Sequence, residues 1–257
     1  MSNILAIAQK ELRQYFVSPM AYALIGLFAI IYGWFFIVSL NFIVRVSMQA
    51  GMGMGGPQTV NINEYMMRPL LGNTAVVMLL VLPMLTSRSY AEEKRSGTIE
   101  LLLSSPLTEL QIILGKFFGA LALFTAMLAV TLVHVAMLFL YGEPELGPIL
   151  SGYLGLWLMG ASFISVGLLI SSASRNQMVA GVVTFGVLLM FWVVSWMGEP
   201  SSGSTTASVL AYLSLLDHFD DFSKGVIDTK HLAYYISFIT FGLFLTVKSV
   251  DSERWRG

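Results

Sequence analysis

Six long runs of apolar residues, each nearly free of charged side chains, constrain this chain more than any other feature of its sequence. Each run approaches the roughly 20 residues that a helix needs to cross a hydrocarbon core about 30 Å thick. The pattern therefore predicts an all-α polytopic membrane protein, with one transmembrane domain over residues 1–257 and six transmembrane helices. We expect these helices at residues 20–42, 70–87, 109–141, 149–172, 178–198 and 232–247.

The composition excludes a water-soluble globule. Only 11% of the 257 residues are charged, against about 25% in an ordinary soluble domain, so lipid must replace water around most of the surface. The net charge of −1 gives no indication of a nucleic-acid partner. The chain has no cysteine, which excludes disulfides, thiolate metal sites and cysteine nucleophiles.

The N-terminal segment 4–16 has the pattern of a helix that lies in the membrane interface. Its apolar residues recur at steps of three and four, while Lys10 and Arg13 fall on the other side, as in an amphipathic interfacial helix. Ser18 and Pro19 then separate this helix from the next one, because serine caps a helix N-terminus and proline fits the first helical position.

The distribution of lysine and arginine predicts the orientation. Six spans place both termini and the second and fourth connections on one side, which holds ten of the 14 basic residues. Positive residues favour the cytoplasm, so we expect a multi-pass membrane protein with both termini cytoplasmic. The outer connections are then residues 45–69, 142–148 and 199–230.

The connection between the second and third predicted spans, residues 88–108, is the most informative part of the sequence. It is longer than an ordinary helix–helix loop. A charged helix end meets a Ser-Gly stop at 96–97, a short helix with an apolar side follows over 98–103, and Thr108 with Gln111 then has the pattern of a capping box. The residues alone leave two interpretations of the short helix open: an interfacial helix with its leucines in lipid, or a docking element for a cytoplasmic partner.

This connection resembles a segment of ABC-2-type ABC transporter permeases. Residues 92–106 place an acidic and basic run before a Gly-Thr pair, then an acidic residue, then leucines that end at Ser-Pro. Weaker matches follow in the order typical of that family: segment 8–16 resembles its interfacial elbow helix, and 171–177 and 212–228 resemble an inner loop and an outer segment. The outer match leans toward permeases of gliding motility and of nitrous-oxide-reductase maturation.

The resemblance implies that 88–108 contains a cytoplasmic coupling helix and that 4–16 is an elbow helix, both in contact with an ATP-binding subunit on a separate polypeptide. That partner would bind ATP and Mg²⁺, while this chain has no cofactor, no metal and no catalytic residue. A second permease copy, as a homodimer or a paired permease, would complete the pore. The residues implied in coupling to the ATP-binding subunit are Lys10, Arg13, Glu92, Glu93, Arg95, Gly97, Thr98 and Glu100.

The sequence has no ATPase motif of its own. A GxxxxGK[ST] phosphate loop does not occur, because Gly115-Lys116 lacks the upstream glycine and the following hydroxyl residue. The chain should therefore not hydrolyse ATP. Gly115 and Gly119 form a small-residue pair that lets two helices approach closely, and we expect it to pack the third span within the subunit.

The outer segment 199–230 contains polar residues of metal-ligating types. Asp217, His218, Asp220 and Asp221 are neighbours in a segment with helical pattern, so they would scatter around the helix axis and form a solvated polar face. The resemblance allows this segment to dip back toward the pore. The methionines of the Gly-rich outer loop favour a linker more than a copper site, because no cysteine or histidine accompanies them.

Two functions agree with these features. The first is ATP-driven export, or movement of a substrate across the membrane, and the second is transmission of mechanical work to an auxiliary protein with a large periplasmic domain. A secondary transporter or channel is disfavoured, because the lipid-embedded parts of the predicted spans contain His134 as their one residue among Asp, Glu, Lys, Arg and His. An intramembrane enzyme is disfavoured because no catalytic constellation occurs there.

Overall fold

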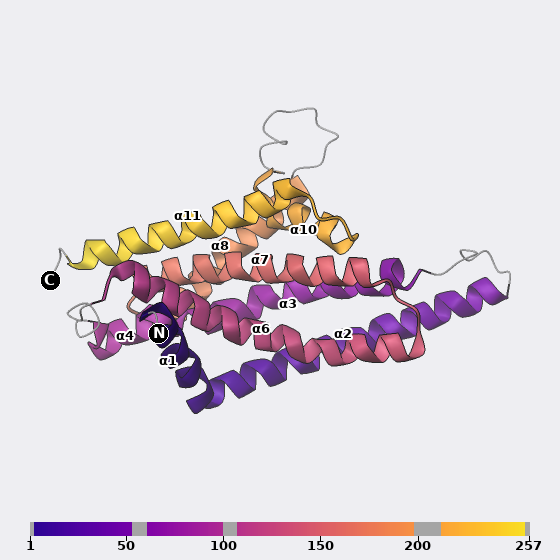
Figure 1. The fold of residues 1–257 in the computed structure, drawn as a ribbon, viewed down its shortest axis with the longest axis horizontal. Coiled ribbons are helices and arrows are strands. Elements are labelled where there is room, and N and C mark those ends of the chain that lie inside the picture. The colour runs from indigo at the N-terminus through magenta and orange to yellow at the C-terminus, as the bar shows by residue number, and fades with distance from the viewer. Residues whose placement is uncertain (1–2, 53–60, 100–106, 198–211, 255–257) are drawn as a thin grey trace.

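The computed structural model describes residues 3–52, 61–99, 107–197 and 212–254, and these residues form helices with short connections and no β-strand (Figure 1). This confirms the predicted all-α fold. The elements are α1 (Asn3–Val17), α2 (Pro19–Gly51), the π-helical turn η1 (Asn63–Met67), α3 (Arg68–Thr86), α4 (Arg88–Ser96), α6 (Glu109–Tyr141), α7 (Leu146–Ala173), α8 (Gln177–Met197), α10 (Leu215–Ser223) and α11 (Thr229–Arg254).

Six helical stretches of the described chain are long and apolar enough to cross a membrane, which confirms the predicted number. Five of them are α2, α6, α7, α8 and α11, and the sixth combines η1, α3 and α4. This combined stretch has 34 residues and would measure about 50 Å at 1.5 Å per residue. It therefore extends beyond a hydrocarbon core of about 30 Å, and α4 is the projecting end.

Two of the six helices are longer than the sequence pattern predicted. α2 continues to Gly51 although its apolar run ends near residue 42, and α11 begins at Thr229 and ends at Arg254. Hydropathy marks the part of a helix that suits lipid, whereas the helix itself continues until a residue breaks it. In α2 no glycine or proline occurs from residue 34 to residue 50. The predicted outer loop 45–69 is therefore helical at both ends.

The start signals that the sequence predicted are present. Ser18 accepts a hydrogen bond from the Met20 amide, with Pro19 in the first turn of α2. Thr108 and Gln111 form the predicted capping box at the start of α6. These caps fix where α2 and α6 begin.

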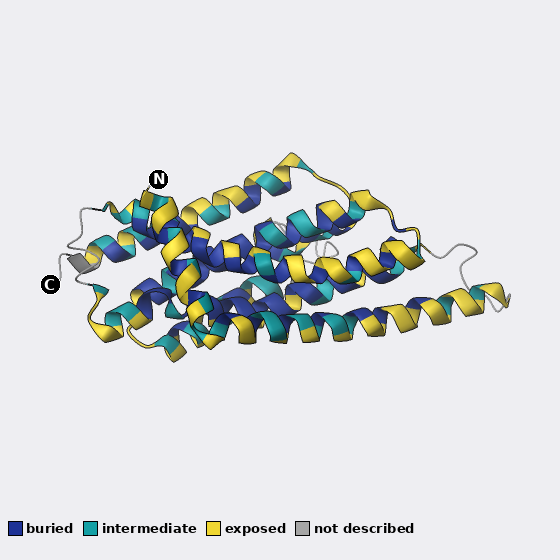
Figure 2. Cartoon of the chain, turned by 60° about the horizontal axis from the view of Figure 1, so that its bottom comes forward, coloured by how far each residue is buried: buried dark blue, intermediate teal, exposed yellow. Residues whose placement is uncertain are grey.

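α7 lies in the middle of the bundle, with other helices around it (Figure 1). Figure 2 shows the buried residues gathered in the interior of the bundle and the exposed ones on its outer faces. Of its most apolar stretch 78% is buried, against 17% for α8. Small residues allow this central position: a Cβ atom on Gly155 would lie 2.7 Å from the Cβ atom of Phe222 in α10. The hydroxyl of Ser151 donates a hydrogen bond of 2.7 Å to the Phe222 carbonyl. α10 therefore lies directly against the backbone of α7.

The predicted small-residue pair of α6 packs within the subunit, as expected. α1 crosses the first turns of α6 at these two glycines. A Cβ atom on Gly115 would lie 2.5 Å from the Cβ atom of Ile7, and one on Gly119 would lie 2.7 Å from the Cβ atom of Glu11. The glycines thus bring Glu11 close to the α6 backbone.

The contact between α7 and α10 gives a testable expectation for stability. We expect Gly155→Ala to lower the unfolding midpoint of the chain in detergent, because overpacking a tight contact typically costs about 1–3 kcal/mol. Gly186→Ala in α8 is the matched control, since no atom lies within 4 Å of its added Cβ and alanine favours a helix by about 1 kcal/mol over glycine. Equal midpoints for the two variants would contradict the close approach of α10.

Candidate functional site

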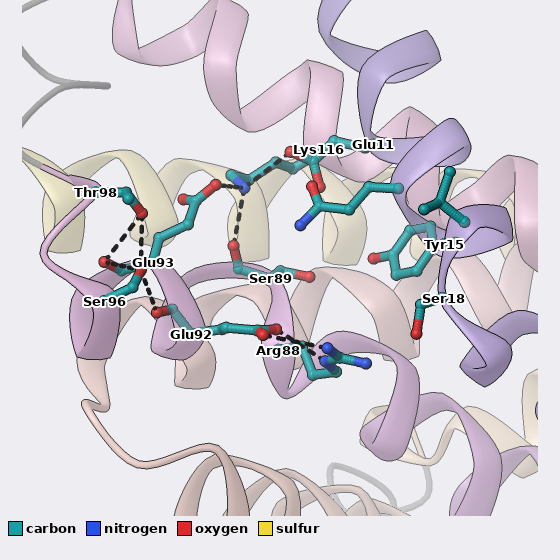
Figure 3. Close-up of a pocket in the computed structure, with 12 residues that line it drawn as sticks. Glu11, Tyr15, Ser18, Arg88, Ser89, Glu92, Glu93, Ser96, Thr98 and Lys116 are labelled. Carbon is teal, nitrogen blue, oxygen red and sulfur yellow. Dashed lines mark hydrogen bonds and ion pairs between the residues drawn. The ribbon is translucent and has the colours of Figure 1, made fainter.

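The candidate site lies at the end of the bundle that holds α4, where α1 and the first turns of α6 meet it (Figures 1 and 3). α4 follows α3 through Ser87, whose backbone is also helical. It ends at Gly97, which has the left-handed backbone conformation with φ 72°, a conformation that glycine adopts without strain. The amide of Thr98 donates a 3.0 Å hydrogen bond to the Glu93 carbonyl. The predicted helix stop at 96–97 is thereby confirmed.

A buried lysine joins the three helices of the site. Lys116 of α6 is only 2% exposed, and its Nζ lies 3.1 Å from Oε1 of Glu11 in α1 and 2.7 Å from Oε1 of Glu93 in α4. It also donates a 2.8 Å hydrogen bond to the carbonyl of Ser89. One ammonium group therefore binds two carboxylates and one backbone oxygen, each on a helix other than its own.

This Lys116 cluster is tight because a buried charge without partners is very costly. The side chain of Glu11 is 8% exposed and that of Glu93 is 18% exposed, so water contributes little to their solvation. Breaking such a pair by removing one partner typically costs about 3–5 kcal/mol. The cluster therefore fixes the position of α4 relative to α1 and α6.

α4 is also attached to the end of α7. The hydroxyl of Ser171 accepts hydrogen bonds from the amides of Tyr90 and Ala91, at 3.1 and 3.2 Å, and donates one of 3.0 Å to the Ser87 carbonyl. Lys94 donates a hydrogen bond from Nζ to the Ser172 carbonyl. The helix that projects from the second span is thus bound to the third span through Lys116 and to the fourth through Ser171.

A cleft of about 450 Å³ opens between α1 and α4. Arg88 and Glu92 line it and form a two-pronged ion pair with distances of 2.9 and 3.2 Å. Burial raises the pKa of the Tyr15 phenol in the same cleft to about 12, so this side chain is a neutral hydroxyl at physiological pH. Figure 3 shows these groups on the α4 side and the α1 side of the cleft.

The structure divides the coupling residues implied by the sequence into three groups. Glu93 belongs to the buried Lys116 cluster, and Gly97 and Thr98 form the end of α4. The other four described residues of this set, Lys10, Arg13, Glu92 and Arg95, are exposed charged side chains. Glu100 and most of the predicted short helix 98–103 lie outside the described residues.

Sequence reasoning missed the partners that hold Glu93. The sequence pattern assigned Lys116 no partner, and it assigned no role to Glu11 or Ser171. A signal was present, because Lys116 is the one lysine or arginine in the 33-residue helix α6. A single charge within a long apolar helix indicates a buried partner of opposite charge.

The prediction of a solvated polar face over 217–221 is wrong for His218. Its side chain is 5% exposed, because α10 turns this face toward α11, where His231 lies. Asp220 and Asp221 remain partly exposed and pair with basic residues. Within the described residues no group of three or more His, Asp or Glu side chains has the arrangement of a metal site.

The Lys116 cluster gives a testable expectation. We expect Lys116→Met to lower the free energy of unfolding by about 3–5 kcal/mol, because it leaves two buried carboxylates without a cation. The measurement is reversible unfolding in mixed detergent micelles. Arg13→Ala is the control, since an exposed side chain typically contributes within about 0.5 kcal/mol.

Neutralising the two carboxylates tests whether uncompensated buried charge causes the loss of stability in Lys116→Met. We expect Lys116→Met combined with Glu11→Gln and Glu93→Gln to recover most of the loss, because no uncompensated charge then remains buried. A triple variant as unstable as Lys116→Met alone would show that packing, and not charge, explains the loss.

Comparison with known proteins identifies the family. The profile of the ABC-2 family transporter proteins matches residues 5–247. The probable multidrug ABC transporter permease YbhR of Escherichia coli (strain K12) is 29% identical over 153 residues, which are 59% of this chain and 41% of that relative. The probable multidrug ABC transporter permease YbhS of the same strain is 32% identical over 119 residues, which are 46% of this chain and 31% of that relative. Each match spans less than half of the relative's own length. Because the family profile covers nearly the whole chain, this protein belongs to the ABC-2 family of transporter proteins.

Proposed function

We propose that this chain is the permease subunit of an ATP-driven ABC-2-type complex in the bacterial inner membrane. Family membership and six membrane-spanning helices support a multi-pass permease. ATP and Mg²⁺ would bind a separate subunit on the cytoplasmic side, at the end of the bundle where α1, α4 and the last turns of α11 lie (Figure 1). A second copy of the chain, or a paired permease, would complete the pore.

The attachment of α4 to three spans is the observation that carries this proposal. α4 continues α3, its Glu93 binds Lys116 of α6, and its backbone binds Ser171 of α7. A displacement of α4 therefore acts on α3, α6 and α7 together. Interfaces of this kind convert a small movement at one site into a rearrangement of packed helices.

The exposed charges of the site supply a docking face for the partner. Lys10, Arg13 and Arg95 are exposed, and Arg13 and Arg95 form no ion pair with any described residue. The acidic Glu92 is already paired with Arg88. Among the described residues of α1 and α4, the exposed charges without an ion pair are thus positive. We propose that they contact an acidic surface of the ATP-binding subunit, since complementary charge steers association and sets the orientation of a complex.

The relatives suggest the cargo to test first. YbhR and YbhS are both named as probable multidrug permeases. We therefore propose export of drug-like molecules as the activity that α4 couples to ATP hydrolysis, with the spans around α7 as the moving part.

Reversing the charge of Arg95 tests the docking face. We expect Arg95→Glu to reduce the amount of ATP-binding subunit that co-purifies with the tagged chain by about fivefold, because replacing attraction by repulsion at an interface costs about 1 kcal/mol or more. Quantitative mass spectrometry of the complex in mild detergent gives the measurement. Arg45→Glu is the matched control, since Arg45 is an exposed arginine near the C-terminal end of α2, whereas α1 precedes the N-terminal end of α2.

Two outcomes would count against this proposal at different levels. If the unaltered chain purifies without an ATP-binding subunit, also after crosslinking, the ATP-driven function is refuted. If the subunit is present but Arg95→Glu and Arg45→Glu retain it equally, the function stands and Arg95 is removed from the docking face.

The proposed orientation is testable because the chain has no native cysteine. We expect Val226→Cys, at an exposed position after α10, to react with a membrane-impermeant maleimide in intact cells. Arg13→Cys in α1 should react only after the membrane is permeabilised, because basic residues favour the cytoplasm. The opposite labelling pattern would invert the topology.

A further inference from the structure

A second buried polar cluster lies where α10 meets the first turn of α11. His218 and His231 are each 5% exposed, and their Nδ1 atoms are 2.6 Å apart. The other ring nitrogen of His218, Nε2, lies 2.9 Å from the carbonyl oxygen of Tyr212. Nε2 of His231 lies 2.8 Å from Oδ2 of Asp221. Four groups thus form one continuous hydrogen-bonded chain.

The hydrogen-bond partners of the two imidazole rings determine which ring nitrogens carry protons. A carbonyl oxygen only accepts, so His218 carries its proton on Nε2 and accepts on Nδ1 in its neutral form. His231 then donates from Nδ1 to His218 and from Nε2 to the Asp221 carboxylate, so its ring is an imidazolium. One positive charge and one negative charge balance each other within the cluster.

Every hydrogen bond of this cluster is made only when His218 carries one ring proton and His231 carries two. One additional proton on His218 would place two N–H groups against each other across 2.6 Å. One proton fewer on His231 would leave a ring lone pair facing either His218 or Asp221. In both cases a buried hydrogen bond is lost, and an unsatisfied buried polar group is costly.

The elements packed against α10 favour a neutral His218. α7 and α8 have no Asp, Glu, Lys, Arg or His over residues 146–173 and 177–197. Tyr234 of α11 stacks on the His218 ring with centroids 3.8 Å apart. Burial in the first place, and then the nearby charges of His231 and Lys230, lower the pKa of His218.

Further charged groups surround the carboxylate side of the cluster. Lys224 and Lys230 lie 3.8 and 4.0 Å from Asp221, so three basic side chains, with His231, surround this carboxylate. The remaining charged residues that face the cluster or its neighbours are Asp217, Asp220, Asp228 and Arg68.

We propose that His218, His231 and Asp221 form a proton-binding latch that holds α10 against α11 and releases it in acid. The latch does not depend on the ATP-binding subunit. Because Phe222 of α10 packs against Gly155 of α7, release of α10 would remove a support of the central helix. The bundle would thereby sense the pH at the end opposite α4.

The sign of the pH dependence follows from proton linkage. Histidine in water has an ordinary pKa of about 6.5, and burial lowers the pKa of His218 in the docked state. Below about pH 6.5 the released state therefore binds an additional proton on His218, so docking weakens as the pH falls. Above about pH 6.5 the docked state holds on His231 a proton that a released imidazole would lose, so docking is strongest near pH 6.5. Each proton taken up on release changes the opening equilibrium by up to about tenfold per pH unit.

Nitrogen NMR of the full chain in lipid nanodiscs tests the proton positions directly, because there are only three histidines to assign. At pH 7.5 we expect His218 as the neutral Nε2–H tautomer and His231 protonated on both nitrogens. A neutral His231 at this pH would overturn the latch, and this measurement needs no variant of the two residues.

Hydrogen exchange of the α10 amides tests the release. After correction for the intrinsic pH dependence of exchange, we expect the protection of residues 215–223 to fall about tenfold between pH 6.5 and pH 5.0. His218→Asn should abolish this fall, because an amide oxygen accepts from His231 but takes up no proton. His134→Asn, at the third histidine, should leave it unchanged. Constant protection in the unaltered chain, or an undiminished fall in His218→Asn, would refute the proposal.

Discussion

The close packing of α7 is the constraint on which the rest of the structure depends. Lipid offers apolar side chains the same environment as a neighbouring helix, so spans associate through tight van der Waals contact and interhelical hydrogen bonds. α7 supplies both with small residues: Gly155 admits Phe222 of α10, and Ser171 binds the backbone of α4. A larger residue at either position would move apart the elements that carry the candidate site and the histidine cluster.

These two polar regions lie toward opposite ends of one helix. α7 has 28 residues, about 40 Å at 1.5 Å per residue, with Ser171 near its end and Ser151 near its start. The first region connects α7 to α4, where we propose that the ATP-binding subunit docks. The second connects it to α10 through Phe222. A central helix held at both ends by specific contacts is a physical route by which pH at one side and ATP hydrolysis at the other would act on the same spans.

Both polar regions contain buried charged groups, and each depends on having all of its hydrogen-bond partners in place. Lys116 is surrounded by two carboxylates and a carbonyl oxygen, and His231 lies between His218 and Asp221. In a low-dielectric interior, an interaction of this kind is strong when every partner is present and costly when one is missing. The Lys116 cluster therefore fixes the position of α4, while the histidine cluster changes with one proton because imidazole titrates near neutral pH.

The local features of the fold could be predicted from the sequence because each depends on neighbouring residues. Ser18 with Pro19, Thr108 with Gln111, and Gly97 mark helix ends through backbone geometry within one turn, and each is where the pattern placed it. The six spans follow from hydropathy. Hydropathy predicts the ends of the helices less accurately, since α2 continues past its apolar run to Gly51.

The sequence by itself determined that this chain is helical, that it has six helices long and apolar enough to cross a membrane, and that its family is recognisable in the segment after the second span. Only the tertiary structure decided which charges meet. Lys116 and Glu11 are 105 positions apart along the chain, and His218 and His231 are on different helices, so no local pattern records their contact. The physical reason is that caps and hydropathy act over one helical turn, whereas the partner of a buried charge is set by how helices pack across small residues such as Gly119 and Gly155.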